Sequence, residues 1–141
     1  MVDTKLPGES FDVVMAIEVL EHVVEDEKFV SNVCKILKQG GVFFMTTPNG
    51  DHVPNDNPDH VRHYTRGGLL EVMRKSFEKV EVNYVIYESK SYFRSLNSWS
   101  VKHPLRTITA MGCSLFCNYQ SKYLKNTAGN SRHLAVVAVK N

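Results

Sequence analysis

The sequence lacks the features that mark membrane-spanning, disulfide-stabilised or nucleic-acid-binding proteins. No apolar run approaches the roughly 20 residues that a bilayer-spanning helix needs. The three cysteines, Cys34, Cys113 and Cys117, form no CxxC pair, which argues against a disulfide framework or a zinc site. The net charge of +2 is small and spread along the chain, so no nucleic-acid partner is expected. We therefore expect a cytoplasmic protein with reduced cysteines.

Other absences narrow the organisation of the chain. Residues 1–10 contain charged residues, Pro7 and Gly8 but no apolar core, so no signal peptide is expected. There is no internal repeat and no glycine-rich loop of the kind that cradles phosphates. The length of 141 residues and the hydrophobic content of 43% suit one domain with a substantial core.

The most informative segment is residues 11–23, FDVVMAIEVLEHV. Its apolar, β-branched first part is typical of a strand that is covered on both faces. Glu18, Glu21 and His22 follow where this strand must end. Ligands of open parallel α/β sheets bind beyond the carboxyl ends of the strands, so this polar cluster marks a candidate site.

The rest of the chain alternates between helical and strand patterns. Acidic residues 25–27 open a helix whose apolar positions recur up to Leu37, and Gly40-Gly41 ends it. Further elements are predicted as follows: strands over 42–45, 79–87 and 134–139, a helix over about 65–76 with Thr65 as N-cap, and a polar loop over 48–63. The aromatic-rich segment 90–130 either packs on the sheet or covers an apolar acceptor.

The order FDVV, EVLEHV, a helix, LKQGG, a strand and TPN resembles the class I S-adenosylmethionine-dependent methyltransferases, with Gln39 where the pattern usually has proline. The resemblance is closest to the ubiquinone- and menaquinone-pathway group and covers about residues 9–88. It implies an α/β fold, namely the C-terminal half of a Rossmann-like methyltransferase domain. The sheet would be mixed, with helices on its faces and the last strand antiparallel between its two predecessors.

The resemblance also implies that residues 1–141 form a single, partial methyltransferase domain. Its parts would be a linker over 1–10, an α/β core over 11–88, a helical and aromatic excursion over 90–130 and the last strand over 131–141. The family's glycine-rich cofactor turn does not occur in this sequence. The edge and outer face of strand 11–17 should then be uncovered, which favours self-association or a partner chain there.

S-adenosylmethionine is the cofactor that the resemblance implies for the complete domain, with a small molecule as methyl acceptor. Ala16, Ile17, Glu18 and Val19 would pass beside the methionine part of the cofactor. The alternative is that Ile17 and Val19 belong only to the core. Methyl transfer needs near-attack geometry, and it needs a general base only when the acceptor carries a proton of high pKa.

Glu21 and His22 are candidate catalytic residues, together with His63. Glu18, Glu21 and His22 have the spacing i, i+3, i+4, which places all three on one face of a helical turn. We expect no metal there; a divalent ion on these three groups is a minor alternative, because histidine is an unusual ligand for Mg²⁺. A purely structural role, with hydrogen bonds to nearby loop backbone, also stays open.

The segment HVRHYT, residues 60–65, resembles a segment that many relatives carry before a helix. His60, Arg62 and Tyr64 are candidate substrate-side residues, and His63 is able to take a proton near neutral pH. The alternative is a helix-entry motif in which Tyr64 packs and Arg62 pairs with a carboxylate. The primary functional hypothesis is methyl transfer from S-adenosylmethionine. The second is a catalytically inactive half-domain that acts as a binding or regulatory module with another chain.

Overall fold

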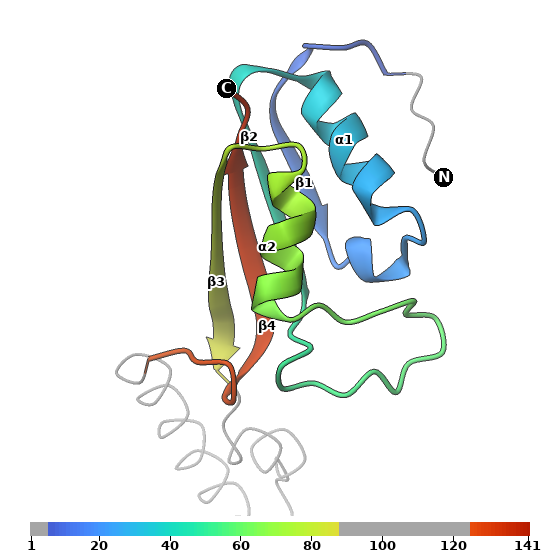
Figure 1. Cartoon of the computed structure of the whole chain (residues 1–141), viewed down its shortest axis with the longest axis vertical. Helices are drawn as coiled ribbons and strands as arrows, with labels where there is room; N and C mark the ends of the chain where they lie inside the picture. Colours follow the sequence, from blue (N-terminus) through green and yellow to red (C-terminus); the bar gives the residue numbers. More distant parts are fainter. Residues whose placement is uncertain (1–5, 88–124) are drawn as a thin grey trace, which may run out of the picture.

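A computed structural model describes residues 6–87 and 125–141, which form a mixed sheet with helices (Figure 1). The elements are β1 (Phe11–Ile17), the 3-10 turn η1 (Leu20–His22), α1 (Asp26–Ile36), β2 (Leu37–Pro48), α2 (Arg66–Arg74), β3 (Lys79–Tyr87) and β4 (Ser131–Val139). Across these described ranges, no helix is long and apolar enough to cross a bilayer. The predicted α/β class is confirmed.

The strand order is β1-β2-β4-β3, with β1 parallel to β2 and β4 antiparallel to both of its neighbours. This confirms the prediction that the last strand inserts between its two predecessors. The antiparallel direction matters for the site, because it brings the start of β4 to the edge where β1 and β2 end. In the β2–β4 pair, for example, Pro48 at the end of β2 lies opposite His133 near the start of β4.

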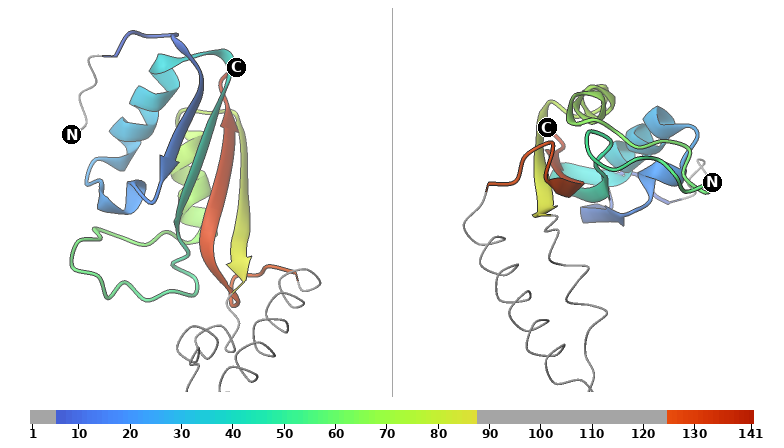
Figure 2. Two further views of the ribbon diagram at one scale, coloured as in Figure 1. Left: turned by 180° about the vertical axis from the view of Figure 1, so that it is seen from behind. Right: turned by 90° about the horizontal axis from the view of Figure 1, so that it is seen from below.

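Both helices cover the same face of the sheet, as the view from below shows (Figure 2). The amphipathic helix α1 buries Val30, Val33 and Ile36 against the sheet, because apolar residues recur along one of its faces. Under the helices, the rings of Phe43 and Phe77 stack with their centroids 6.0 Å apart. The core is therefore a single layer between helices and sheet.

The bounds of β2 differ most from the prediction, because this strand spans Leu37–Pro48 and not only residues 42–45. Helix α1 ends at Ile36, and the fully buried Leu37 begins β2 five residues before the predicted strand. Here Leu37 pairs with Phe11, and the chain reaches the regular ladder through an irregularity in which Gly40 adopts φ +75. A helical pattern in sequence cannot distinguish a last buried helix residue from a first buried strand residue.

The other predicted elements agree well with the structure. Strands β1 and β3 match their predicted ranges, and β4 begins three residues earlier than predicted. Thr65 is the N-cap of α2, and its hydroxyl accepts a hydrogen bond from the amide of Gly68 at 3.1 Å. The segment 88–124 is not among the described residues, so both interpretations of the aromatic excursion lie outside them.

One face of β1 is exposed. Val13, Met15 and Ile17 are 55, 64 and 50% exposed, on the face opposite the helices. Burial of this strand on both faces is therefore wrong for the described part of the chain, where helices cover one face only. The uncovered apolar row and the position of β1 at a sheet edge agree with the prediction of an uncovered strand.

A buried network fixes the start of α1 to the segment before α2. Asp26 is 9% exposed. Its carboxylate forms an ion pair with Arg62 and accepts a hydrogen bond from the hydroxyl of Tyr64 at 2.7 Å. Burial alone would raise the pKa of Asp26, but hydrogen bonds from Tyr64, the Glu27 amide and Arg62 outweigh burial and lower the pKa. The network therefore stabilises the ionised carboxylate.

We expect Asp26→Asn to lower the free energy of unfolding at neutral pH by about 1–3 kcal/mol, because it removes the charge that pairs with Arg62. Glu27→Gln is the matched control: the neighbouring carboxylate pairs with Lys75 in the open, so its loss should cost less than about 1 kcal/mol. Chemical denaturation measures both values.

The same pair of variants gives a pH test. The pKa of Asp26 is lower in the folded than in the unfolded chain, so its stabilisation is complete above the unfolded value of about 3.9. It is lost as the pH falls through the folded-state pKa. The stability gap between wild type and Asp26→Asn should therefore narrow in acid, and a gap that stays constant would contradict this account.

The exposed row on β1 predicts concentration-dependent association of the 141-residue chain. Met15→Glu should reduce this association, because it places a charge in the middle of the row. Val24→Glu is the control, since Val24 is 69% exposed but lies outside the strand. Light scattering over a concentration series measures the effect. A wild-type chain that stays a folded monomer at high concentration would rule out the row as an association surface.

Candidate functional site

The site begins where β1 ends, at a residue with an uncommon backbone conformation. Glu18 has φ +52, in the left-handed region that residues other than glycine rarely adopt. Its amide still donates to the carbonyl of Thr46 at 3.0 Å, so the chain turns sharply while it remains attached to β2. Strained residues of this kind concentrate at functional sites.

The Glu18 side chain bridges β2 and β4. It accepts a hydrogen bond from the hydroxyl of Thr46 at 2.8 Å, and its other oxygen lies 3.2 Å from Nε2 of His133. Burial alone would raise the pKa of Glu18, but the contacts with His133 and Thr46 outweigh burial and lower the pKa. Glu18 is thus held as an anion at the strand ends.

Glu21 is the buried centre of the site. It is 1% exposed, and its carboxylate accepts a hydrogen bond from the hydroxyl of Thr47 at 3.0 Å. Its backbone carbonyl accepts the amide of Val61 at 2.7 Å. One residue of η1 therefore contacts both the end of β2 and the loop between β2 and α2.

Asn49 fixes the start of that loop. It is fully buried, and its side-chain amide donates to the carbonyls of Ala128 and Ser131 at 3.0 and 2.8 Å. The next residue, Gly50, lies so close to the returning chain that a Cβ there would sit 3.0 Å from the backbone of His63. The loop consequently returns to the strand ends and carries its histidines with it.

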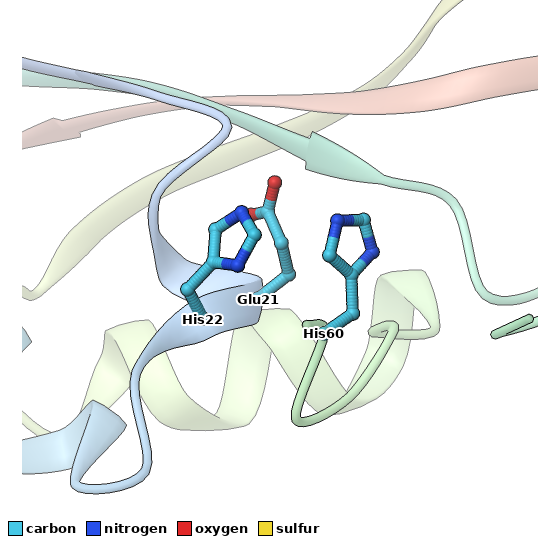
Figure 3. Close-up of side chains that lie close together, drawn as sticks. All are labelled: Glu21, His22 and His60. Carbon is cyan, nitrogen blue, oxygen red and sulfur yellow. The ribbon is translucent and has the colours of Figure 1, made fainter. Parts of the chain in front are cut away.

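Two histidines, His22 and His60, lie beside Glu21, and a third, His63, contacts His60. The Nδ1 atom of His22 lies 2.9 Å from the carbonyl of Asp59, and Nδ1 of His60 lies 2.8 Å from Nε2 of His63. The rings of His22 and His60 are 4.7 Å apart and nearly perpendicular. Figure 3 shows that each of these two rings turns a nitrogen toward the Glu21 carboxylate.

A pocket of about 460 Å³ opens at this edge of the sheet. Its polar lining comprises Glu18, Asp56, Asn57, His60, His63, Arg132 and His133. Its volume lies within the range of small-molecule sites, which hold a few convergent polar groups. The start of β4 supplies one wall, because that strand is antiparallel to β2.

Glu21, His22 and His60 present donor atoms that all lie within 4.8 Å of one another. This group differs from the expected one, because Glu18 turns to His133 and Thr46 and His60 stands in its place. Two imidazoles and one carboxylate suit zinc or another first-row ion better than magnesium, which prefers oxygen ligands.

The structure brings together most of the predicted site residues and separates two of them. Glu18, Glu21, His22, His60 and His63 gather at the strand ends. By contrast, Arg62 and Tyr64 point to Asp26, the geometry of the helix-entry alternative.

The residues expected to line the cofactor differ in what they can offer. Ile17 and Val19 are 50 and 36% exposed at the end of β1, so their side chains are accessible to a bound group. Ala16 is 6% exposed, which leaves only its backbone for such a contact. The cofactor role predicted for these residues therefore depends on the exposed apolar side chains of Ile17 and Val19 and on the backbone of Ala16.

Sequence reasoning missed His133, Thr47 and Asn49. The signal for Asn49 and Thr47 was present in the segment TTPN directly after a buried strand. His133 lies 115 positions after Glu18, and only the antiparallel insertion of β4 shows that they meet.

Comparison with known proteins agrees with this fold. A sequence profile for the methyltransferase domain matches residues 1–45. The chain is 34% identical over 87 residues to a "probable S-adenosylmethionine-dependent methyltransferase" of Mycolicibacterium smegmatis, covering 57% of this chain and 34% of that protein. Over 42 residues it is 55% identical to a ubiquinone biosynthesis O-methyltransferase of Methylobacterium nodulans, covering 30% of this chain and 17% of that enzyme.

Solved structures show the same fold at low sequence identity. A methyltransferase from Archaeoglobus fulgidus matches with a TM-score of 0.62 and 14% identity, over 96% of this chain and 62% of that one. Phosphoethanolamine N-methyltransferase 2 of Haemonchus contortus, solved with S-adenosyl-L-methionine, matches with a TM-score of 0.58 and 16% identity, over 96% and 34%.

The match to the curated mycobacterial relative spans about a third of that relative's length. Within that span, sequence profile, curated relatives and fold agree with one another. Over the matched residues the chain is similar in sequence to S-adenosylmethionine-dependent methyltransferases, and its described residues have the fold of solved methyltransferases.

Proposed function

We propose that this chain forms the acceptor side of a site that transfers a methyl group from S-adenosylmethionine to a small molecule. The observation that carries the proposal is the pocket at the carboxyl ends of β1 and β2, lined by His60, His63 and the Glu18 carboxylate. Open α/β sheets bind their ligands at this edge.

The end of β1 would hold the cofactor. Ile17 and Val19 would contact it through exposed apolar side chains, and Ala16 through its backbone. The bound cofactor supplies an electrophilic methyl group on a positively charged sulfur. The lowered pKa of Glu18 keeps a negative charge beside that position, which favours a cationic ligand.

The histidines would serve the acceptor. A hydroxyl acceptor must lose its proton as it attacks the methyl group, and imidazole is the side chain best suited to take it near neutral pH. His22 and His60 flank the buried Glu21 carboxylate, which would stabilise an imidazolium after proton uptake. Arg62 would not bind an anionic acceptor here, because Asp26 already neutralises it.

A second candidate is a non-catalytic module that binds another chain. The observation that favours it is the exposed row Val13, Met15 and Ile17. Calorimetric titration with S-adenosylmethionine separates the candidates. It is carried out on the 141-residue chain alone and on the same chain joined to a glycine-rich cofactor-binding half of the family, which is called the intact enzyme below. A module that only binds a partner would take up no cofactor in either form.

We expect Glu21→Ala and His22→Ala to lower kcat of the intact enzyme by about 100-fold while the affinity for S-adenosylhomocysteine stays within twofold. The physical reason is that His22 is one of the proposed acceptor histidines and Glu21 lies beside it, whereas the proposed cofactor contacts lie at the end of β1. Steady-state kinetics and calorimetry measure the two quantities.

Lys75→Gln is the control for these variants, because the Lys75 side chain is exposed and forms its ion pair with Glu27, which is not part of the site. Lys75→Gln should change neither kcat nor the affinity for S-adenosylhomocysteine. If the alanine variants weakened cofactor binding and left turnover intact, Glu21 and His22 would belong to the cofactor shell.

We expect methyl transfer to proceed without added magnesium. Glu18, the second carboxylate that Mg²⁺ would need, is engaged by His133 and Thr46, and the remaining nitrogen ligands suit this ion poorly. The test is turnover after dialysis against a chelator, with and without restored Mg²⁺. Loss of activity that only Mg²⁺ reverses would restore the magnesium alternative.

A further inference from the structure

Two hydrogen bonds in series connect the loop backbone to the ring of His60. Nδ1 of His63 lies 3.0 Å from the backbone carbonyl of Val53, and Nε2 of the same ring lies 2.8 Å from Nδ1 of His60. The backbone of His63 is itself held against Gly50, whose amide donates to the carbonyl of Tyr64 at 2.8 Å. Val53 is held in turn, because its amide donates to the carbonyl of Asn49 at 2.7 Å.

The direction of these bonds fixes where the protons lie. A carbonyl only accepts, so Nδ1 of His63 must carry a proton. In a neutral imidazole the other nitrogen is then bare, and Nε2 of His63 must accept from Nδ1 of His60. His60 therefore carries its proton on Nδ1, which leaves a lone pair on its Nε2. For the neutral pair, no other assignment satisfies both bonds.

That lone pair is directed to the site. The close-up shows one nitrogen of His60 facing the Glu21 carboxylate and the other facing away (Figure 3). Since Nδ1 is bound to His63, the nitrogen that faces Glu21 is Nε2. His60 also lines the pocket, so a molecule bound there would lie beside this ring.

We propose that His63 is a positioning residue: anchored by the carbonyl of Val53, it holds His60 in the Nδ1–H tautomer and so presents Nε2 of His60 as the base for the acceptor. The role of His60 as a base rests on the proposed function, whereas the tautomer itself does not. His22 has the same tautomer by the same reasoning, because its Nδ1 faces the carbonyl of Asp59.

The step that this arrangement serves is balanced. The acceptor O–H bond breaks and its proton goes to Nε2 of His60. The oxygen forms a bond to the methyl group as the bond from that carbon to the sulfur of S-adenosylmethionine breaks, which releases S-adenosylhomocysteine. The proton on Nδ1 of His60 is then able to pass to Nε2 of His63, whose Nδ1–H bond to Val53 is unchanged.

Long-range ¹H–¹⁵N NMR spectra of the histidine rings test the tautomer without any activity measurement. At about pH 9, more than two units above the ordinary histidine value of about 6.5, neutral rings show one protonated and one bare nitrogen. In the wild-type protein, His60 should show a protonated Nδ1 and a bare Nε2. His63→Ala should convert this signal into a mixture of tautomers, since the acceptor for Nδ1–H is gone.

His63→Gln is the conservative variant, because its side-chain carbonyl can replace Nε2 of His63 as acceptor and should restore the Nδ1–H tautomer. His52→Gln is the control, since His52 belongs to the same loop but stands outside this series of bonds. In the intact enzyme, His63→Ala should lower kcat about 10- to 100-fold, as loss of an orienting partner does, and His63→Gln should recover most of it.

The outcomes separate this proposal from the proposed function. A wild-type His60 that carries its proton on Nε2, or a tautomer that His63→Ala leaves unchanged, would overturn the proposal even if methyl transfer is found. If the NMR spectra show the predicted tautomers but no methyl transfer is detected, the positioning role of His63 would be supported and the role of His60 as a base would be contradicted. Equal loss of kcat in His63→Ala and His63→Gln would also overturn the positioning role of His63. Glutamine still offers a hydrogen-bond acceptor to Nδ1 of His60, so loss of that hydrogen bond would not explain the result.

Discussion

The site depends on the burial of one carboxylate, that of Glu21. It sits in the 3-10 turn after β1, yet its side chain is bound by Thr47 of β2 and its backbone by Val61 of the loop. A carboxylate without such partners would be expensive to bury. Its hydrogen bonds therefore do two things, since they compensate the lost hydration and lock three separate segments into one arrangement. The histidines acquire their positions from that arrangement.

Electrostatics divide the strand ends into two parts. Glu18 is held as an anion by His133 and Thr46, on the side formed by β4. Glu21 faces two imidazoles on the side formed by the loop. The two acidic residues of the EVLEH segment, three positions apart, thus have separate surroundings. The left-handed backbone at Glu18 causes this separation, because it turns the chain between them.

Much of the fold was readable from the sequence, because apolar periodicity and caps are local properties. The alternation of residues 79–87 and the cap at Thr65 predicted β3 and the start of α2 correctly. The failure at Leu37 was also local, since a buried leucine after a helix suits either element. The order of β2, β4 and β3 came from family resemblance, and periodicity alone does not contain it.

The candidate site was only partly readable, for a different reason. The cluster of Glu18, Glu21 and His22 lies within five residues and is visible as a motif. The choice between site and structural roles for His60 and Arg62 depends on which way each side chain points along an irregular loop. His63 faces His60 while Arg62 faces Asp26, and no periodic pattern encodes that difference. Contacts such as Glu18 with His133 join residues far apart in sequence.

The central place of β4 has a consequence for how the molecule reaches its working form. The side-chain amide of Asn49 donates to the carbonyls of Ala128 and Ser131, which lie 79 and 82 positions later in the sequence. In addition, β4 must insert between β2 and β3, which both precede it in the sequence. Contacts of such high sequence separation carry a large loop-closure cost and tend to form late in folding. The pocket wall at His133 is therefore assembled only with the middle of the sheet. Without β4, the chain would have His22, His60 and His63 but would lack the pocket wall at His133, so a complete pocket requires the complete sheet.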